Sequence, residues 1–170
     1  YGKTKLLETL PPYQGGGEMI SEVTFEKTTY ADLPHKFEAG TPNICGGIAF
    51  GAAVDYLNHI GLDEIAAYEN DLLIYATEQL IKIEGLRIYG PTQDKTAVIS
   101  FNVENIHPYD LGVLLDKMGI AVRTGQHCTQ PIMDFYSIPG TVRASFAFYN
   151  TKTEIDLFVT AVKKAVMMLA

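Results

Sequence analysis

The change in hydrophobic period after Gly85 constrains the fold more than any other feature, because short strand patterns alternate there with helical ones. Strands are expected at Leu86–Tyr89, Ala97–Val103, Ile120–Arg123 and Thr141–Phe148. Helices are expected at Tyr109–Met118, Ile132–Tyr136 and Lys152–Leu169, the last opened by a Thr-x-x-Glu capping box at Thr151–Glu154. Strands interleaved with helices predict a two-layer α/β sandwich from roughly residue 61 onward.

The first sixty residues show a different pattern of hydrophobic and turn-forming residues. Proline and glycine interrupt any helical periodicity in the first forty, and Ser21–Tyr30 alternates β-branched or aromatic residues with polar ones, which predicts an exposed hairpin or hooked ribbon. A Gly-Thr-Pro-Asn turn then leads into a helix expected over Ile44–His59, with Asn43 as its N-cap. After Gly61 an amphipathic helix is expected over Leu62–Ile83. We therefore expect two parts, residues 1–60 and 61–170, the first too irregular to fold alone.

The composition narrows the classes of protein and partner. An apolar share of 47% with 19% charged residues is typical of a soluble globular protein, and a net charge of −7 attracts neither nucleic acid nor an anionic membrane. The longest uncharged apolar stretch, Ile44–Val54, is too short and glycine-rich to span a bilayer, and no secretory signal is recognisable. Two cysteines do not make a disulfide framework. We expect a cytoplasmic protein whose partners are small molecules or proteins.

The segment IAVRTGQHC, which ends at Cys128, carries the most chemical information. An apolar strand is expected to end at Arg123, Gly125 permits a sharp turn, and His127 and Cys128 then stand side by side on a loop. A thiolate is the reactive form of cysteine and cationic neighbours favour it, so Arg123 and His127 are the local candidates for that role. On the dipeptide alone, Cys128 as an ordinary small residue and His127 as a polar loop residue remain open.

Two arginines are candidates for binding. Period-two alternation in TVRASFAF places Arg143 on the polar face of its strand, among small residues. A guanidinium in this position can bind a carboxylate through two parallel hydrogen bonds. Arg123 ends the strand expected before the cysteine loop. The alternatives are a surface arginine at 143 and a structural ion pair with an acidic neighbour at 123.

The turn FEAGTPN is a candidate anion site. Exposed N–H groups at a helix N-terminus favour anions, Gly40 allows close approach of the backbone, and Thr41 adds a hydroxyl donor. Most turns of this kind are only helix starts.

RTGQHC, with the VRAS strand downstream and the FEAGTPN turn upstream, resembles the SUF-type cysteine desulfurase and selenocysteine lyase family. This family is class V aminotransferase-like and has PLP fold type I. The likeness runs through YGK, PPYQGGGEMI, GIAVRTGQHC and FYNT, over essentially the whole chain. It implies the small C-terminal domain of a PLP-dependent transferase as a two-layer α/β sandwich, preceded by a trailing piece of the large PLP-binding domain.

The resemblance also implies roles. Cys128 would accept sulfur from L-cysteine as a persulfide, with release of alanine, for iron–sulfur cluster assembly. Arg143 would hold the substrate carboxylate, and Arg123 would position the substrate or the loop. His127 would transfer a proton or shape the loop. Thr41 and Gly40 would meet the phosphate of pyridoxal 5′-phosphate across a homodimer interface. The Schiff-base lysine of the family lies upstream of YGK and is not Lys3, so this chain alone is expected to be inactive.

The resemblance also bears on the sulfur acceptor and on alternative functions. Family members that pass sulfur to a zinc-containing scaffold carry a histidine where Tyr109 stands, so Tyr109 favours a zinc-free acceptor protein with its own cysteine. The spacing of His107, His127 and Cys128 matches no structural zinc site, and no metal is expected. A selenocysteine lyase, another class V aminotransferase-like enzyme, and a non-catalytic binding or regulatory domain remain alternatives.

Overall fold

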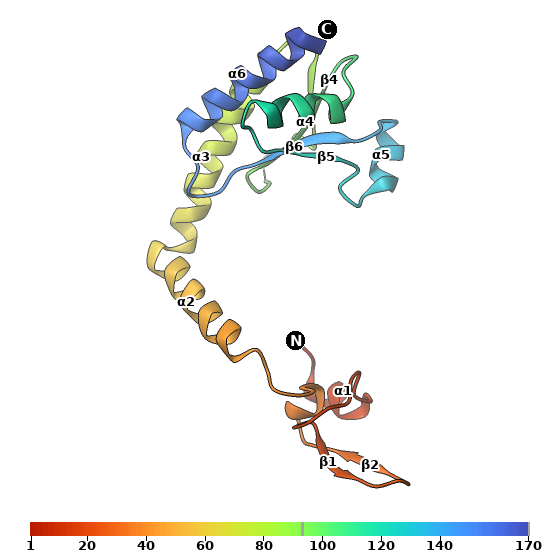
Figure 1. Cartoon of the computed structure of the whole chain (residues 1–170). Coiled ribbons are helices and arrows are strands. Elements are labelled where there is room, and N and C mark those ends of the chain that lie inside the picture. The colour runs from red at the N-terminus through yellow and green to blue at the C-terminus, as the bar shows by residue number, and fades with distance from the viewer. Residues whose placement is uncertain (93, 170) are drawn as a thin grey trace. The chain divides into compact units, whose positions relative to one another are not determined.

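Figure 1 shows the computed structural model of the chain, which describes residues 1–92 and 94–169. The chain divides into two compact units, Tyr1–His59 and Ile60–Ala170. Among the described residues, none of the helices combines the length and apolar character that a membrane span requires.

The first unit contains a two-stranded antiparallel sheet and short helical segments. Its elements are α1 (Thr4–Thr9), β1 (Ile20–Val23), β2 (Thr28–Tyr30), the 3-10 helix η1 (His35–Phe37) and α2 (Ile44–Ile60). The hairpin lies within the segment where the alternation predicts one. Helix α1 was not expected, because its six residues are too few to show a period. It is held from outside, since Lys36 Nζ donates hydrogen bonds to Leu7 O at 3.3 Å and Glu8 O at 3.0 Å.

Backbone hydrogen bonds join the glycine-rich segment of this unit to the turn before α2. Gly17 O accepts from Gly40 N and from Met19 N, each at 2.8 Å, and Met19 is fully buried. Asn43 Oδ1 accepts from Gly46 N at 2.9 Å, which confirms Asn43 as the N-cap of α2. The Gly40–Thr41 turn is therefore anchored on both sides.

The second unit is a four-stranded sheet with helices. Its elements are α3 (Leu62–Leu80), β3 (Leu86–Tyr89), β4 (Val98–Val103), α4 (Pro108–Lys117), β5 (Arg123–Gly125), α5 (Gln130–Tyr136), β6 (Thr141–Ser145) and α6 (Lys152–Leu169). The strand order is β3-β4-β6-β5, and every neighbouring pair is antiparallel.

Alternation along the central strands separates the two faces of this sheet. One face is buried beneath α3, α4 and α6, and Figure 1 shows α4 and α6 on the same side of the strands. The core on that face includes Ile99, Phe101, Val142, Leu111, Leu115, Leu72, Leu80, Ile155 and Val162. Ser100 and Arg143 alternate with these residues and so belong to the opposite face. This is the expected two-layer α/β sandwich.

Element boundaries differ from the expectation where pairing partners are missing. The strand expected at Ile120–Arg123 was wrong: Arg123–Gly125 pair with β6, while Ile120 and Val122 pack against the core outside the ladder. Ile120 N donates instead to Leu115 O at 2.9 Å, at the end of α4. Helix α3 ends at Leu80 rather than at Ile83, after which the chain turns into β3.

Local hydrogen bonds set the end of the last strand, β6, and the start of the last helix, α6. Strand β6 ends at Ser145, because Ala147 N donates to Asn150 Oδ1 at 2.9 Å rather than to a neighbouring strand. The expected capping box is confirmed: Thr151 N donates to Glu154 Oε2 at 2.7 Å, and Glu154 N donates to Thr151 Oγ1 at 3.2 Å.

The packing of α4 on β5 depends on a glycine, which gives a stability prediction. A Cβ at Gly112 would overlap the Thr124 methyl group. We expect Gly112→Ala to lower the free energy of unfolding by about 1–3 kcal/mol, despite the better helix propensity of alanine. Thr124→Ser removes the methyl group and should recover most of that loss in the double variant, as measured by urea unfolding. An equal effect of Gly112→Ala in both backgrounds would contradict this packing.

Candidate active site

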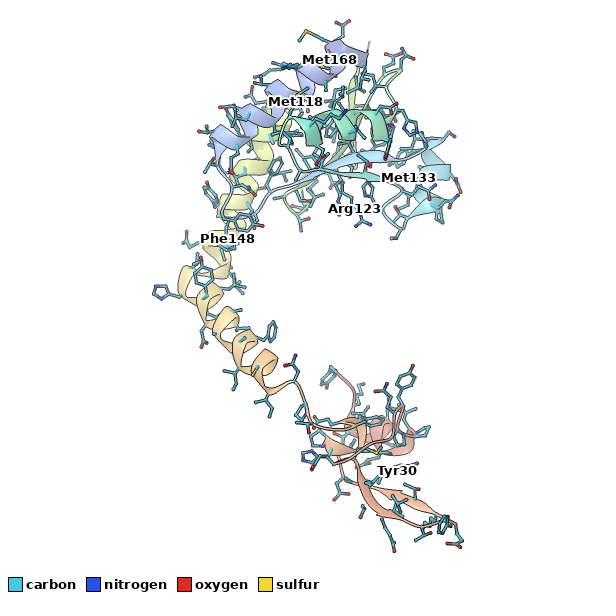
Figure 2. The ribbon with its side chains drawn as sticks, in the orientation of Figure 1. Tyr30, Met118, Arg123, Met133, Phe148 and Met168 are labelled. Atoms are coloured by element: carbon cyan, nitrogen blue, oxygen red, sulfur yellow. The ribbon has the colours of Figure 1, made fainter. Side chains whose placement is uncertain are left out.

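The open face of the second unit's sheet carries a row of polar residues. Arg143 in the central strand β6 pairs with Ser100 on β4 and with Arg123 on β5, so the three lie side by side across the sheet. Figure 2 shows Arg123 on the side of the unit away from Met118 and Met168, which lie among the helices. The row therefore faces away from the helical layer.

Among the described residues, no carboxylate pairs with the arginines of this row. Like charges directly opposite on neighbouring strands are destabilising, yet within residues 1–92 and 94–169 no ion pair involves Arg123 or Arg143. The structure therefore gives no support to an ion pair between Arg123 and an acidic neighbour. The Nε atom of Arg143 is also buried without a hydrogen-bond partner. An anionic ligand at this position would relieve both costs.

Arg143 borders a pocket of about 340 Å³, which we call the Arg143 pocket. This volume is within the range of small-molecule sites, about 300–1,000 Å³. Its lining is Tyr89, Gly90, Ser100, His127, Thr129, Ile132, Met133, Tyr136, Ile138, Thr141 and Arg143. The pocket combines an apolar wall from α5 with the polar row of the sheet.

Cys128 lies on a tight turn formed by Gln126–Thr129, which we call the Cys128 turn. His127 and Cys128 have φ values of 55° and 61°, and Gln126 O accepts from Thr129 N at 3.0 Å. Successive left-handed residues closed by such a bond are characteristic of a type I′ turn, which glycine and asparagine favour. Each left-handed residue of another type costs about 1–3 kcal/mol, so the turn stores strain. Strain of this kind clusters at functional sites.

The thiol of Cys128 is exposed and has a cationic neighbour. Arg123 Nη2 donates to Cys128 Sγ at 3.9 Å. Two residues that line the Arg143 pocket, His127 and Thr129, flank Cys128. The structure thus brings Cys128, Arg123, Arg143 and His127 together at one edge of the sheet.

His127 is held by Thr141, at the start of β6. The imidazole Nε2 lies 3.1 Å from Thr141 O and 3.0 Å from Thr141 Oγ1. Because a carbonyl oxygen only accepts, the geometry assigns the ring proton to Nε2. The other ring nitrogen, Nδ1, is buried without a partner.

The charge state of His127 follows from its surroundings. Burial lowers the pKa of His127 from its ordinary value of 6.5, the bond to Thr141 raises it, and the positive charges of Arg143 and Arg123 lower it further. The imidazole is therefore neutral near pH 7. Of the two cations expected beside Cys128, only Arg123 carries its charge there.

Gly40 and Thr41 belong to the first unit. Gly40 has a φ of 82°, which favours glycine, and no atom lies within 4 Å of where its Cβ would be. Thr41 is exposed, and in the described part of the chain its hydroxyl has no hydrogen-bond partner. The Gly40 N–H is occupied by Gly17 O, and the Gly46 N–H by Asn43 Oδ1. Within the described residues, the free donors here are the Thr41 hydroxyl and the N–H groups of Ile44 and Cys45, the first two of α2.

Two residues of the site, Thr141 and Tyr89, were not predicted from the sequence. Thr141 is 1% exposed, and its only sequence signal is that it shares a strand face with Arg143. Tyr89 lines the Arg143 pocket with its ring edge-on to Tyr136 at 5.2 Å, a contact between distant segments that no local pattern indicates.

No group of three or more potential metal ligands occurs within residues 1–92 and 94–169. His107 instead caps α4, with its Nδ1 accepting from Tyr109 N at 3.2 Å.

Comparison with known proteins identifies the family. The model of the aminotransferase class-V family matches residues 1–158, and the chain belongs to that family. It is 50% identical over 169 residues to a probable cysteine desulfurase of Xylella fastidiosa (strain Temecula1), covering 99% of this chain and 41% of the relative. It is 52% identical over 161 residues to a probable cysteine desulfurase of Streptomyces coelicolor, covering 94% and 38%. The chain thus spans about two fifths of the length of these relatives.

Solved structures agree. The cysteine desulfurase CsdA of Escherichia coli matches 100% of this chain and 42% of its own, with a TM-score of 0.92 and 38% identity. A cysteine desulfurase of Thermococcus onnurineus matches 99% and 42%, with a TM-score of 0.91 and 37% identity. These findings confirm the family resemblance and the α/β fold expected from the sequence.

The strain in the Cys128 turn predicts a stability difference between two variants. Glycine adopts left-handed φ values without the steric cost that alanine meets, about 1–2 kcal/mol. We expect Cys128→Gly to be about 1 kcal/mol more stable than Cys128→Ala in urea unfolding, after allowance for the greater freedom of glycine in the unfolded chain. Equal stability of the two variants would show that the turn is not left-handed in solution.

The lowered pKa of His127 predicts a dependence of stability on pH. Between the folded-state pKa and the ordinary value of 6.5, the unfolded chain binds the proton more readily, so stability rises with pH there. This contribution is complete above about pH 6.5 and is lost as the pH falls through the folded pKa. Urea unfolding at about pH 7.5 and about pH 5 should show a smaller difference in His127→Gln than in the unchanged protein. Identical differences would contradict the assignment.

Proposed function

We propose that the whole protein is a SUF-type, PLP-dependent cysteine desulfurase that converts L-cysteine to L-alanine and transfers the sulfur to Cys128 as a persulfide. The observation that carries the proposal is an exposed thiol on a strained turn beside a pocket whose arginine has no carboxylate partner among the residues that the structure describes. The cysteine desulfurases that match nearly the whole chain support it.

Arg143 recognises the substrate. A guanidinium binds a carboxylate through two parallel hydrogen bonds, and the buried Nε of Arg143 has no competing partner. The Ser100 hydroxyl lies beside it in the sheet and also lines the pocket. This arrangement orients the amino acid with its α-carboxylate at the sheet.

Cys128 accepts the sulfur. Its thiolate attacks the sulfur of L-cysteine, so a sulfur–sulfur bond forms and the carbon–sulfur bond breaks. The electron pair of the broken bond stays with the three-carbon product, which gains a proton and leaves as alanine. The positive charge of Arg123, 3.9 Å from Sγ, favours the anionic nucleophile. Because the thiol is exposed, the persulfide is accessible to an acceptor.

The residues of the first unit suit the phosphate of pyridoxal 5′-phosphate. The unpartnered Thr41 hydroxyl and the free N–H groups at the start of α2 are donors, and Gly40 leaves room beside them. The cofactor supplies an electron sink for loss of the α-proton when it is bound. In the described part of the chain no lysine lines the Arg143 pocket, which supports the proposal that these 170 residues alone are inactive.

Homodimerisation, a zinc-free acceptor and a cytoplasmic location complete the proposal. Helix α2 has no buried residue, and its exposed Ile44, Ile48 and Phe50 suit a covering partner. Tyr109, 63% exposed at the start of α4, is accessible to an acceptor protein. The acceptor would carry the sulfur to iron–sulfur cluster assembly.

The proposal is tested in the full-length protein loaded with pyridoxal 5′-phosphate. Mass spectrometry should find one added sulfur atom on Cys128 after incubation with L-cysteine, and none in Cys128→Ser. Arg143→Lys should raise the KM for L-cysteine by about 10–100-fold, because a forked charged hydrogen bond is lost.

Cys45→Ser is the matched control, since this exposed thiol lies in the other unit, and it should keep the added sulfur on Cys128. Alanine formation at an unchanged rate in Cys128→Ser with an acceptor protein present would reject the persulfide role.

A further inference from the structure

The Cys128 turn needs an outside restraint to keep its shape. Two consecutive left-handed residues, neither of them glycine, persist only where surrounding contacts outweigh their cost. Within the turn the contacts are those of Thr129, whose N–H and hydroxyl both donate to Gln126 O, at 3.0 Å and 2.7 Å. Neither bond involves the side chain of His127 or of Cys128.

Two side chains outside the turn contact it: Arg123 of β5 reaches Cys128 Sγ at 3.9 Å, and Thr141 of β6 makes the shorter contacts, with His127. Thr141 offers His127 Nε2 both its carbonyl oxygen and its hydroxyl, and Thr141 is the one polar residue among the buried side chains of the described chain. A buried hydroxyl is costly unless it is hydrogen-bonded, and its partner here is that imidazole. Thr141 itself pairs with Gly125 of β5, and the pairing of β6 with β4 begins at the next residue, Val142.

We propose that Thr141 is a positioning residue, which holds the imidazole of His127 and thereby keeps the Cys128 turn in its left-handed conformation. It acts on Cys128 through His127, and its consequence for sulfur transfer rests on the proposed function. The positioning itself does not, because it is a property of the folded second unit. Thr141 also fixes the His127 tautomer, which leaves Nδ1 as an unprotonated acceptor in a ring that lines the Arg143 pocket.

Amide hydrogen exchange of the 170-residue chain tests this directly. The Thr129 N–H reports on the turn, because its bond to Gln126 O closes it, and the Phe101 N–H reports on the sheet. In Thr141→Val, which keeps the size and removes the hydroxyl, exchange at Thr129 should accelerate about fivefold, the effect of one net hydrogen bond. Thr141→Ser should restore the original rate, and Phe101 should be unchanged in all three proteins.

Nitrogen-15 shifts of the His127 ring provide a spectroscopic signature. They should show the proton on Nε2 in all three proteins, because the backbone carbonyl oxygen of residue 141 accepts it in each, while the Nε2 shift itself should change only in Thr141→Val, which loses the hydroxyl contact. Unchanged exchange at Thr129 in Thr141→Val would overturn the proposal. Parallel acceleration at Thr129 and Phe101 would also overturn it, because Thr141 would then be only a general stabiliser. Since neither readout requires turnover, a failed positioning role remains distinguishable from a failed desulfurase assignment.

Discussion

The antiparallel pairing of β5 with β6 is the contact on which the candidate site depends. It sets Arg123 opposite Arg143 and Gly125 opposite Thr141, and so fixes the strands at both ends of the segment that carries Cys128. The approach of the two strands is close: a Cβ at Gly140 would lie 2.8 Å from Gly125 backbone atoms. Only three residues of β5 pair: Arg123 and Gly125 flank the site, while Thr124 packs against Gly112 of α4.

The arrangement around this pairing has an energetic cost. Arg123 and Arg143 are register partners and neither forms an ion pair within residues 1–92 and 94–169, the Nε of Arg143 is buried without a partner, and the turn beyond Gly125 contains two left-handed residues. The helical layer on the other face is by contrast apolar and closely packed, with residues such as Leu72, Phe101 and Val162 buried. The stability of that layer sustains the strained and charged arrangement on the open face.

Prediction from sequence succeeded where the determinants were local. The Thr151–Glu154 capping box, the Asn43 cap and the alternation in β6 each depend on residues within a few positions of one another. It failed at Ile120–Val122, an apolar run with strand character that has no strand to pair with, and at α1, whose carbonyls are bound by the distant Lys36. Strand limits depend on a partner, and no local pattern reveals the partner.

The sequence by itself determined the family, the order of helices and strands in the second unit, and the candidacy of Cys128, Arg123 and Arg143, because motifs and periodicity are properties of neighbouring residues. Only the tertiary structure decided that Arg123 and Arg143 form an unneutralised pair, that His127 is a neutral ring held by Thr141, and that Tyr89 borders the same pocket. Each of these facts joins segments far apart along the chain. Register, burial and charge environment are set by such contacts.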